Sequence, residues 1–166
     1  MEGGRSLGRD VREGRRAVSA EAAELIRLLD ALQAAERAGA QALERWVASC
    51  RDPRLRGGLR VICARDRSHA ALAEARLRAL GGVPTATAGR ELQAVCGVVA
   101  DPEVSDRSKL ALLIGRLAGG VEGTVERVVR TSEVDAETQA LLAAIGEDDL
   151  ASVRWLRAVH DALDGR

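Results

Sequence analysis

The chain has 166 residues, the length of one domain with a single hydrophobic core. Its 25 basic and 25 acidic side chains give a formal net charge of zero, so no overall field favours nucleic acid or an anionic membrane. Aromatic residues make up 1% of the chain, as Trp46 and Trp155, which argues against base-stacking surfaces and tyrosyl-radical chemistry. Alanine and leucine supply 51 of the 166 residues, and this composition predicts an all-α protein.

Residues 1–18 are rich in glycine and arginine and poor in large apolar side chains, so we expect a flexible tail followed by one domain over residues 19–166. The arginines could touch phosphate, but a solvated tail is favoured and we expect no nucleic-acid partner. The segment lacks the apolar core of a signal peptide, and no run of 18 apolar residues occurs in the chain. We therefore expect no membrane partner and a cytoplasmic location.

Four long stretches with a helical spacing of apolar residues follow the tail. Ser19 is the expected N-cap of the first, and Asp52-Pro53 supplies an N-cap and a proline at the first helical position of the second. The adjacent Gly57 and Gly58 weaken the first turns of that second helix. The predicted helices span about residues 19–50, 53–80, 105–130 and 136–163.

The connections between these helices differ in length, because the first and the last are short whereas residues 81–104 form a long crossover. Within the crossover, apolar residues at positions 92, 95, 96 and 99 predict a short amphipathic helix, which we expect to lie across one end of the bundle. Two helical hairpins joined by one long crossover are the connectivity of a ferritin-like antiparallel four-helix bundle.

Each long helix carries an acidic residue where its own apolar pattern predicts burial, and a histidine follows the second of these acids at i+3 on the same face. A buried carboxylate costs several kcal/mol unless it is paired, protonated or bound to a cation. In di-metal helical bundles, two helices each supply one Glu and the other two each supply a Glu-x-x-His pair. The candidate metal ligands are therefore Glu36, Asp66, His69, Glu122 and Asp149.

From about residue 21 to residue 163 the chain resembles the ferritin-like, rubrerythrin-type superfamily. The segments that carry the resemblance are residues 32–40 (LQAAERAGA), Asp52-Pro53-Arg54-Leu55 followed by Asp66-x-x-His69, and residues 148–156 (DDLASVRWL). Residues 89–92 and 120–123 look most like small bacterial members of the superfamily. The resemblance implies a carboxylate-bridged Fe or Mn site with oxygen, peroxide or iron chemistry, and self-association, for example as a homodimer.

Three positions depart from the pattern of that superfamily. Asp66 and Asp149 stand where Glu is usual, so each carboxylate falls short by about one carbon–carbon bond length unless the helices approach more closely. Ser152 stands where the second His is expected, which removes a nitrogen ligand. We therefore expect a degenerate site that binds at most one transition-metal ion, weakly, and depends on Glu36, Asp66 and His69.

Two alternatives stay open beside this expectation. The first is an intact Fe or Mn di-metal oxidoreductase. The second is a metal-free structural or protein-interaction module, in which the four candidate carboxylates pair with arginines or face solvent. The arginines that could pair with them are Arg27, Arg37, Arg67 and Arg154.

Small residues and cysteines offer two further features. Gly115, Gly119 and Gly123 form a stripe of small residues on the third predicted long helix. Such a stripe permits close approach of another helix, either within the fold or at a dimer interface. The three cysteines, Cys50, Cys63 and Cys96, form no C-x-x-C pair and are expected to be buried apolar side chains.

Overall fold

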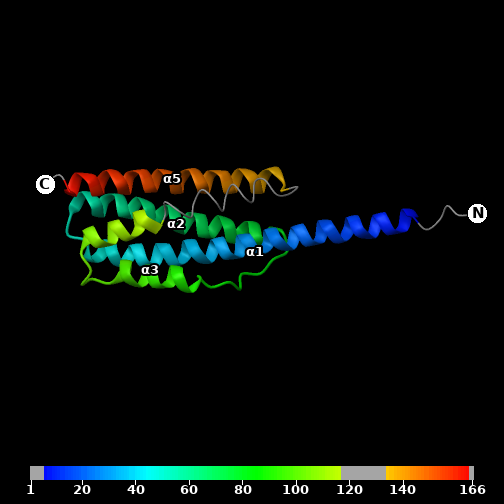
Figure 1. Cartoon of the computed structure of the whole chain (residues 1–166), viewed down its shortest axis with the longest axis horizontal. Helices are drawn as coiled ribbons and strands as arrows, with labels where there is room; N and C mark the ends of the chain where they lie inside the picture. Colours follow the sequence, from blue (N-terminus) through cyan, green and yellow to red (C-terminus); the bar gives the residue numbers. More distant parts are fainter. Residues whose placement is uncertain (1–5, 117–133, 165–166) are drawn as a thin grey trace, which may run out of the picture.

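A computed structural model of the protein describes residues 6–116 and 134–164, and these residues form helices joined by short irregular segments, with no strand among them (Figure 1). The all-α prediction is therefore confirmed for this part of the chain. The helices are α1 (Ser6–Ser49), α2 (Pro53–Ala79), α3 (Arg90–Ala100) and α5 (Ala136–Asp164), together with a helix whose described part covers residues 106–116.

Helix α1 begins at Ser6 and continues without interruption through the residues predicted as a tail, so the predicted start at Ser19 is wrong. Arginine has a high helix propensity, and isolated glycines inside a helix are tolerated at a cost of about 1 kcal/mol each. In Figure 1 the N-terminal part of α1 continues past the ends of α2 and α5. The domain boundary at residue 19 and the flexibility of residues 1–18 stay predictions.

The predicted N-cap of α2 is confirmed, and α5 has an N-cap of the same kind. The Asp52 carboxylate accepts hydrogen bonds from the backbone N–H groups of Arg54 and Leu55, with Pro53 at the first helical position. The Asp135 carboxylate likewise accepts from the Thr138 backbone N–H at 3.0 Å and from its hydroxyl at 2.7 Å. These side chains satisfy amide donors that the first turn of a helix leaves unpaired.

Helix α2 runs antiparallel to both α1 and α5, as the residue numbers of their contacts show. Between α1 and α2, Arg37 contacts Glu74 whereas Ala40 contacts Cys63 farther toward the start of α2. Between α2 and α5, Arg65 contacts Asp148 and Arg76 contacts Asp135. Figure 1 shows these three helices lying side by side along the long axis of the molecule.

The larger of two apolar clusters lies at the end of the molecule where α1 turns into α2. Trp46 is fully buried there, and its indole N–H donates to the Asp106 carboxylate at 2.7 Å. The same carboxylate accepts from the backbone N–H of Arg51, and the Lys109 ammonium lies 5.6 Å from the centre of the Trp46 ring. These contacts fix the start of the 106–116 helix against the α1–α2 turn.

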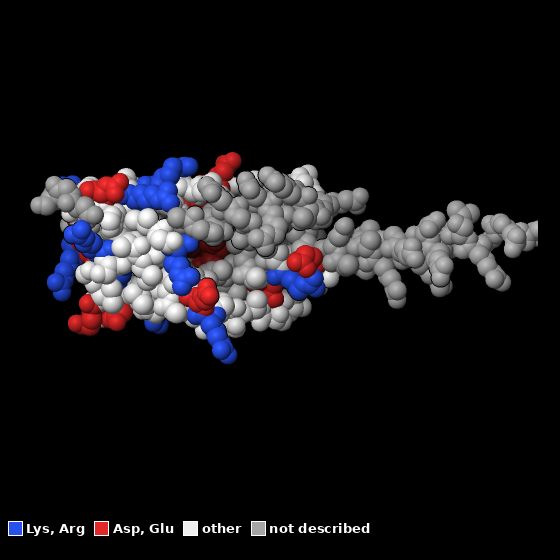
Figure 2. All heavy atoms as spheres, in the orientation of Figure 1, with Lys and Arg blue, Asp and Glu red and all other residues white. Residues whose placement is uncertain are grey.

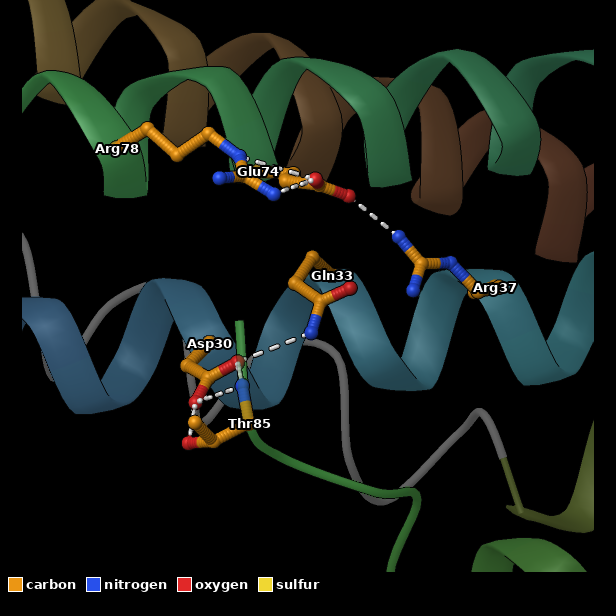
Figure 3. Close-up of polar contacts among 6 residues, drawn as sticks. All are labelled: Asp30, Gln33, Arg37, Glu74, Arg78 and Thr85. Carbon is orange, nitrogen blue, oxygen red and sulfur yellow. Dashed lines mark hydrogen bonds and ion pairs between the residues drawn. The ribbon is translucent and has the colours of Figure 1, made fainter. Parts of the chain in front are cut away.

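The crossover begins after Gly81, whose φ of 83° lies in the left-handed region that glycine tolerates. The buried Asp30 carboxylate on α1 holds the next residues, because it accepts hydrogen bonds from the backbone and hydroxyl of Thr85 (Figure 3) and from the backbone of Ala86. Burial acts to raise the pKa of Asp30, but these hydrogen bonds and one from Gln33 outweigh it and lower the pKa.

The predicted short helix in the crossover is confirmed as α3, with Val95 and Val99 buried. Its predicted position across one end of the bundle is wrong, since α3 packs along the side of α1 (Figure 1). The Asp30 contacts hold the start of the crossover against α1, and the buried Val95 and Val99 of α3 pack into the main core along the same helix.

The described surface carries acidic and basic side chains interspersed with one another on the face shown in Figure 2. This mixture agrees with the zero net charge of the chain. None of the helices in the described part of the chain contains an apolar segment of the length needed to cross a bilayer.

Candidate metal centre

Glu36 on α1 and the pair Asp66 and His69 on α2 form a group whose possible ligand atoms all lie within 4.8 Å of one another. The i, i+3 spacing on α2 places the carboxylate and the imidazole on one face, and that face is turned toward α1. The His69 side chain is 7% exposed and the Glu36 side chain is 11% exposed. The structure therefore brings together the three residues on which the predicted single-ion site depends.

The two ring nitrogens of His69 have different environments. Nδ1 is buried and makes no hydrogen bond, although a carboxylate oxygen of Glu36 lies 3.5 Å away. Nε2 lies 3.3 Å from a carboxylate oxygen of Asp148 on α5. Two ligands of one tetrahedral ion, each bound at 2.1 Å, would be about 3.4 Å apart. The Nδ1–Glu36 separation fits two ligands of one ion, and Asp148 occupies the place of the outer carboxylate that orients such a histidine.

Asp148 is a functional candidate that the sequence prediction missed. Its carboxylate lies 3.8 Å from Nε of Arg65, and its backbone carbonyl accepts a hydrogen bond from the Ser152 hydroxyl at 2.9 Å. The pair of adjacent acids Asp148-Asp149 is visible in the sequence, but only Asp149 continues the apolar pattern of the helix. The role of Asp148 depends on the side-by-side packing of α2 and α5.

Asp149 also lies near the group, with a carboxylate oxygen 3.8 Å from Nδ1 of His69. Its side chain is 27% exposed, and together with Glu36 and Asp66 it lines one interior cavity. Three of the four predicted acids thus meet. The fourth, Glu122, lies outside the described residues, as do Gly119 and Gly123 of the predicted glycine stripe.

The short reach of Asp66 is offset by a glycine on the facing helix. A Cβ atom added to Gly39 of α1 would lie 3.2 Å from Oδ2 of Asp66, which is tighter than an ordinary contact. Glycine at this position therefore lets the Asp66 carboxylate lie directly against the backbone of α1. Gly39 thus permits a close approach of α1 to α2 beside Asp66.

Burial and like charges dominate the electrostatics of the group. Desolvation, with the nearby Glu36 and Asp149 carboxylates, raises the pKa of Asp66 to about 8. Desolvation and Glu36 likewise raise the pKa of Asp149 to about 7. The Glu36 carboxylate, against the opposing effect of burial and with the help of Asp148, raises the pKa of His69 to about 9. A divalent cation would relieve this crowding of carboxylates.

Three of the arginines considered as metal-free partners of these acids are engaged elsewhere. Arg27 pairs with Glu24 on its own helix, and Arg67 pairs with Glu44. Arg37 pairs with Glu74, which also accepts from Arg78 (Figure 3). For these three arginines the proposed pairing with the described acids Glu36, Asp66 and Asp149 is wrong, because the arginines lie on the exposed sides of α1 and α2.

The prediction that the cysteines are buried is confirmed for two of the three. Cys50 and Cys63 are buried, as predicted, and burial raises the pKa of the Cys50 thiol to about 11. The Cys63 thiol, which could have faced the site, instead lies 3.3 Å from the Ala40 carbonyl. Cys96 on α3 is only half-buried and lines the interior cavity beside the acids.

Comparison with protein-family models, with curated proteins and with solved structures found no match to this chain.

Proposed function

We propose that the protein is a metal-binding helical bundle of the ferritin-like type that holds one divalent transition-metal ion between Glu36, Asp66 and His69. The observation that carries the proposal is the two-sided environment of His69. The buried Nδ1, which makes no hydrogen bond, faces the carboxylates of Glu36 and Asp149, and Nε2 faces the outer carboxylate of Asp148. Buried polar atoms are normally hydrogen-bonded, so an unpaired one aimed at acids calls for a ligand.

The donor set suits Fe, Mn, Co or Zn in the divalent state, since one imidazole and two carboxylates combine intermediate and hard ligands. Such an ion, when bound, would polarise oxygen ligands at the coordination positions that the protein leaves open. Asp148 and Arg65 would hold the imidazole in the tautomer that presents Nδ1 to the ion, while Gly39 leaves room for Asp66.

The ferritin-like part of the proposal is supported by the directions of the helices. The chain runs antiparallel from α1 to α2, and a long crossover then returns it along α1 to the start of the 106–116 helix (Figure 1). This connectivity is the one that the superfamily resemblance implies. The self-association implied by the same resemblance stays a prediction.

A metal-free helical module is the second candidate, and the same geometry provides the observation that favours it. A protonated His69 between the largely buried Glu36 and the half-exposed Asp148 would form a partly buried ion-pair network, and the raised pKa of His69 favours that protonated form. Metal binding must displace this proton and the one on Asp66, so a weak site is expected.

Titration of the metal-free protein with Co(II), followed by absorption spectroscopy and metal analysis, separates the two candidates. We expect one Co(II) ion per chain. His69→Ala should weaken binding by at least about 100-fold, because a direct ligand matters more than an outer partner, whereas Asp149→Ala should weaken it by less than about tenfold.

His160→Ala provides the matched control, because His160 is the other histidine of the chain and its ring lies beside Asp161 near the end of α5. This variant should bind Co(II) like the parent protein. Equal losses in His69→Ala and Asp149→Ala would indicate a symmetric di-metal centre. Absence of Co(II) binding by the parent protein would favour the metal-free module.

A further inference from the structure

A partly open cavity of about 450 Å³ lies between α1, α2, α3, α5 and the 106–116 helix. Ten of its described lining side chains are Leu, Ile or Val, and they come from all five helices. Protein interiors are close-packed, so an empty space of this size would leave these side chains without packing partners. A cavity of this size and lining is typical of small-molecule sites.

The cavity is long and narrow. On α1 its lining extends from Leu32 to Leu43, a rise of about 16 Å at 1.5 Å per residue. On α5 it extends from Leu142 to Leu156, which is about 21 Å by the same measure. A space of that length and limited volume fits a linear chain better than a fused ring system.

The polar part of the lining is acidic. The carboxylates of Glu36, Asp66 and Asp149 line the cavity partway along its length, between the aliphatic residues at its two ends. The cations beside this group are Arg65 and, when protonated, His69, and Asp148 adds a fourth carboxylate. Among the described residues at this group, the four carboxyl groups therefore outnumber the two cationic side chains, and a bound ammonium group displaces the proton that Asp66 otherwise holds.

The lining also contains one described basic residue, Arg116, which lies at the surface side. Its guanidinium faces Glu91 on α3 at 3.4 Å, and both side chains are exposed. Arg116 is therefore already neutralised and does not reverse the sign of the cavity wall. An anionic head group would meet like charge along this wall, whereas a cationic one would meet complementary charge.

We infer that this cavity binds one linear aliphatic amine, with its chain along the Leu, Ile and Val lining and its ammonium group against Glu36, Asp66 and Asp149. The inference is independent of metal binding, but it shares Glu36 and Asp66 with the proposed function. An ammonium group and a divalent cation therefore exclude each other, and the amine occupies the metal-free protein.

Two small side chains lie between the cavity and a neighbouring groove. Ala42 of α1 and Cys96 of α3 line the cavity and also line an open groove between α1 and the crossover. A larger side chain at either position would fill space needed by the aliphatic chain without changing any charge. Substitution of Ala42 therefore tests the chain and substitution of Asp149 tests the head group.

Calorimetric titration of the metal-free, full-length protein with decylamine, decanol and decanoic acid, each below its micelle concentration, provides the test. We expect one decylamine per chain, with decanoic acid bound at least about tenfold more weakly because it lacks the complementary charge. Asp149→Asn should weaken decylamine binding by about tenfold and leave decanol binding unchanged. Ala42→Leu should weaken binding of all three compounds.

Equal binding of decylamine and decanoic acid, or undiminished binding to a folded Ala42→Leu protein, would overturn the inference, since both indicate non-specific adsorption. If Ala42→Leu fails to fold by circular dichroism, Cys96→Leu replaces it with the same expected result. Co(II) added to the amine complex should release the amine. Amine binding without any Co(II) binding would refute only the proposed metal site, and Co(II) binding without amine binding would refute only this inference.

Discussion

Nε2 of His69 on α2 lies 3.3 Å from a carboxylate oxygen of Asp148 on α5, although the two residues are 79 positions apart in the chain. This contact predicts that Asp148 positions His69 without binding the ion itself. Asp148→Ala should lower Co(II) affinity by about 10–100-fold, because the imidazole loses the partner that fixes its tautomer and orientation. Asp148→Asn, which keeps an acceptor oxygen, should lower Co(II) affinity by less than Asp148→Ala does.

The control for Asp148 is Asp161→Ala, which removes an acid of α5 whose side chain is 84% exposed. Isothermal titration with Co(II) should give the parent affinity for that variant. Equal affinity of Asp148→Ala and the parent protein would show that Asp148 plays no part in orienting His69.

Asp66 should destabilise the metal-free protein at high pH. Its pKa is raised from 3.8 to about 8, so the folded state holds the proton that the unfolded state releases, and stability falls as pH rises between these values. The pKa of His69 is raised from 6.5 to about 9, which adds a further loss of stability as the pH rises between 6.5 and about 9. Asp66→Asn removes the first contribution, and urea unfolding at pH 9 should show the variant to be more stable by about 1–3 kcal/mol.

The same Asp66→Asn protein should no longer bind Co(II) measurably, which separates the two roles of the residue. At pH 4, where Asp66 is protonated in the folded parent protein, the free energies of unfolding of the parent and the variant should differ by less than they do at pH 9. A variant less stable than the parent at pH 9 would contradict the buried, crowded environment of this carboxylate.

Gly39 should matter for metal affinity more than for folding. In Gly39→Ala the new Cβ would lie 3.2 Å from Oδ2 of Asp66, so the carboxylate must shift by a few tenths of an ångström, while helix propensity improves by about 1 kcal/mol. We expect weaker Co(II) binding with unchanged or higher thermal stability. Gly97→Ala on α3, where a Cβ meets nothing within 4 Å, is the control and should leave Co(II) binding unchanged.

Gly57 and Gly58 are equivalent in the sequence but should respond oppositely to alanine. A Cβ on Gly57 meets nothing within 4 Å, so Gly57→Ala should stabilise α2 by about 1 kcal/mol. A Cβ on Gly58 would lie 2.0 Å from the Trp155 ring of α5, so Gly58→Ala should destabilise the protein by about 1–3 kcal/mol through overpacking. Denaturant unfolding of both variants checks the difference in sign.

Features that depend on neighbouring residues could be predicted from the sequence, whereas features that depend on tertiary packing could not. The caps at Asp52 and Asp135 follow from side chains that reach amides two or three residues ahead. Glu36, Asp66 and Asp149 could be selected because each interrupts an apolar stripe. Asp148 and Gly39 could not, since their roles arise from the register between helices that are distant in sequence.

The start of α1 and the position of α3 were missed for similar physical reasons. A Gly- and Arg-rich segment has no apolar stripe to mark a helix, yet α1 continues through it. The amphipathic pattern of residues 92–99 predicts that a helix packs on something, but its partner is set by the Asp30 contacts with Thr85 and Ala86. The path of the crossover thus depends on a buried carboxylate far away in the sequence, which the local pattern does not reveal.

Ser152→His should raise transition-metal affinity by restoring the nitrogen ligand that the superfamily resemblance implies at this position. Ser152 is 8% exposed, lies one turn after Asp148 and Asp149 on α5, and lines the same cavity as Glu36, Asp66 and Asp149. An imidazole there adds a ligand that Fe(II) or Co(II) prefers to oxygen alone, so affinity should rise by about tenfold or more.

The cost of Ser152→His depends on the space around residue 152. The serine hydroxyl donates to the Asp148 carbonyl and accepts from Arg65, and both contacts would be lost. The cavity of about 450 Å³ gives the larger ring room, so metal-free stability should fall by about 1 kcal/mol, at the low end of the overpacking range. Ser68→His, one residue before His69 on the exposed side of α2, is the matched control and should leave affinity unchanged. If a folded Ser152→His protein binds Co(II) no better than the parent, residues 149 and 152 do not serve a common metal site, and the proposal of a ferritin-like centre must be abandoned.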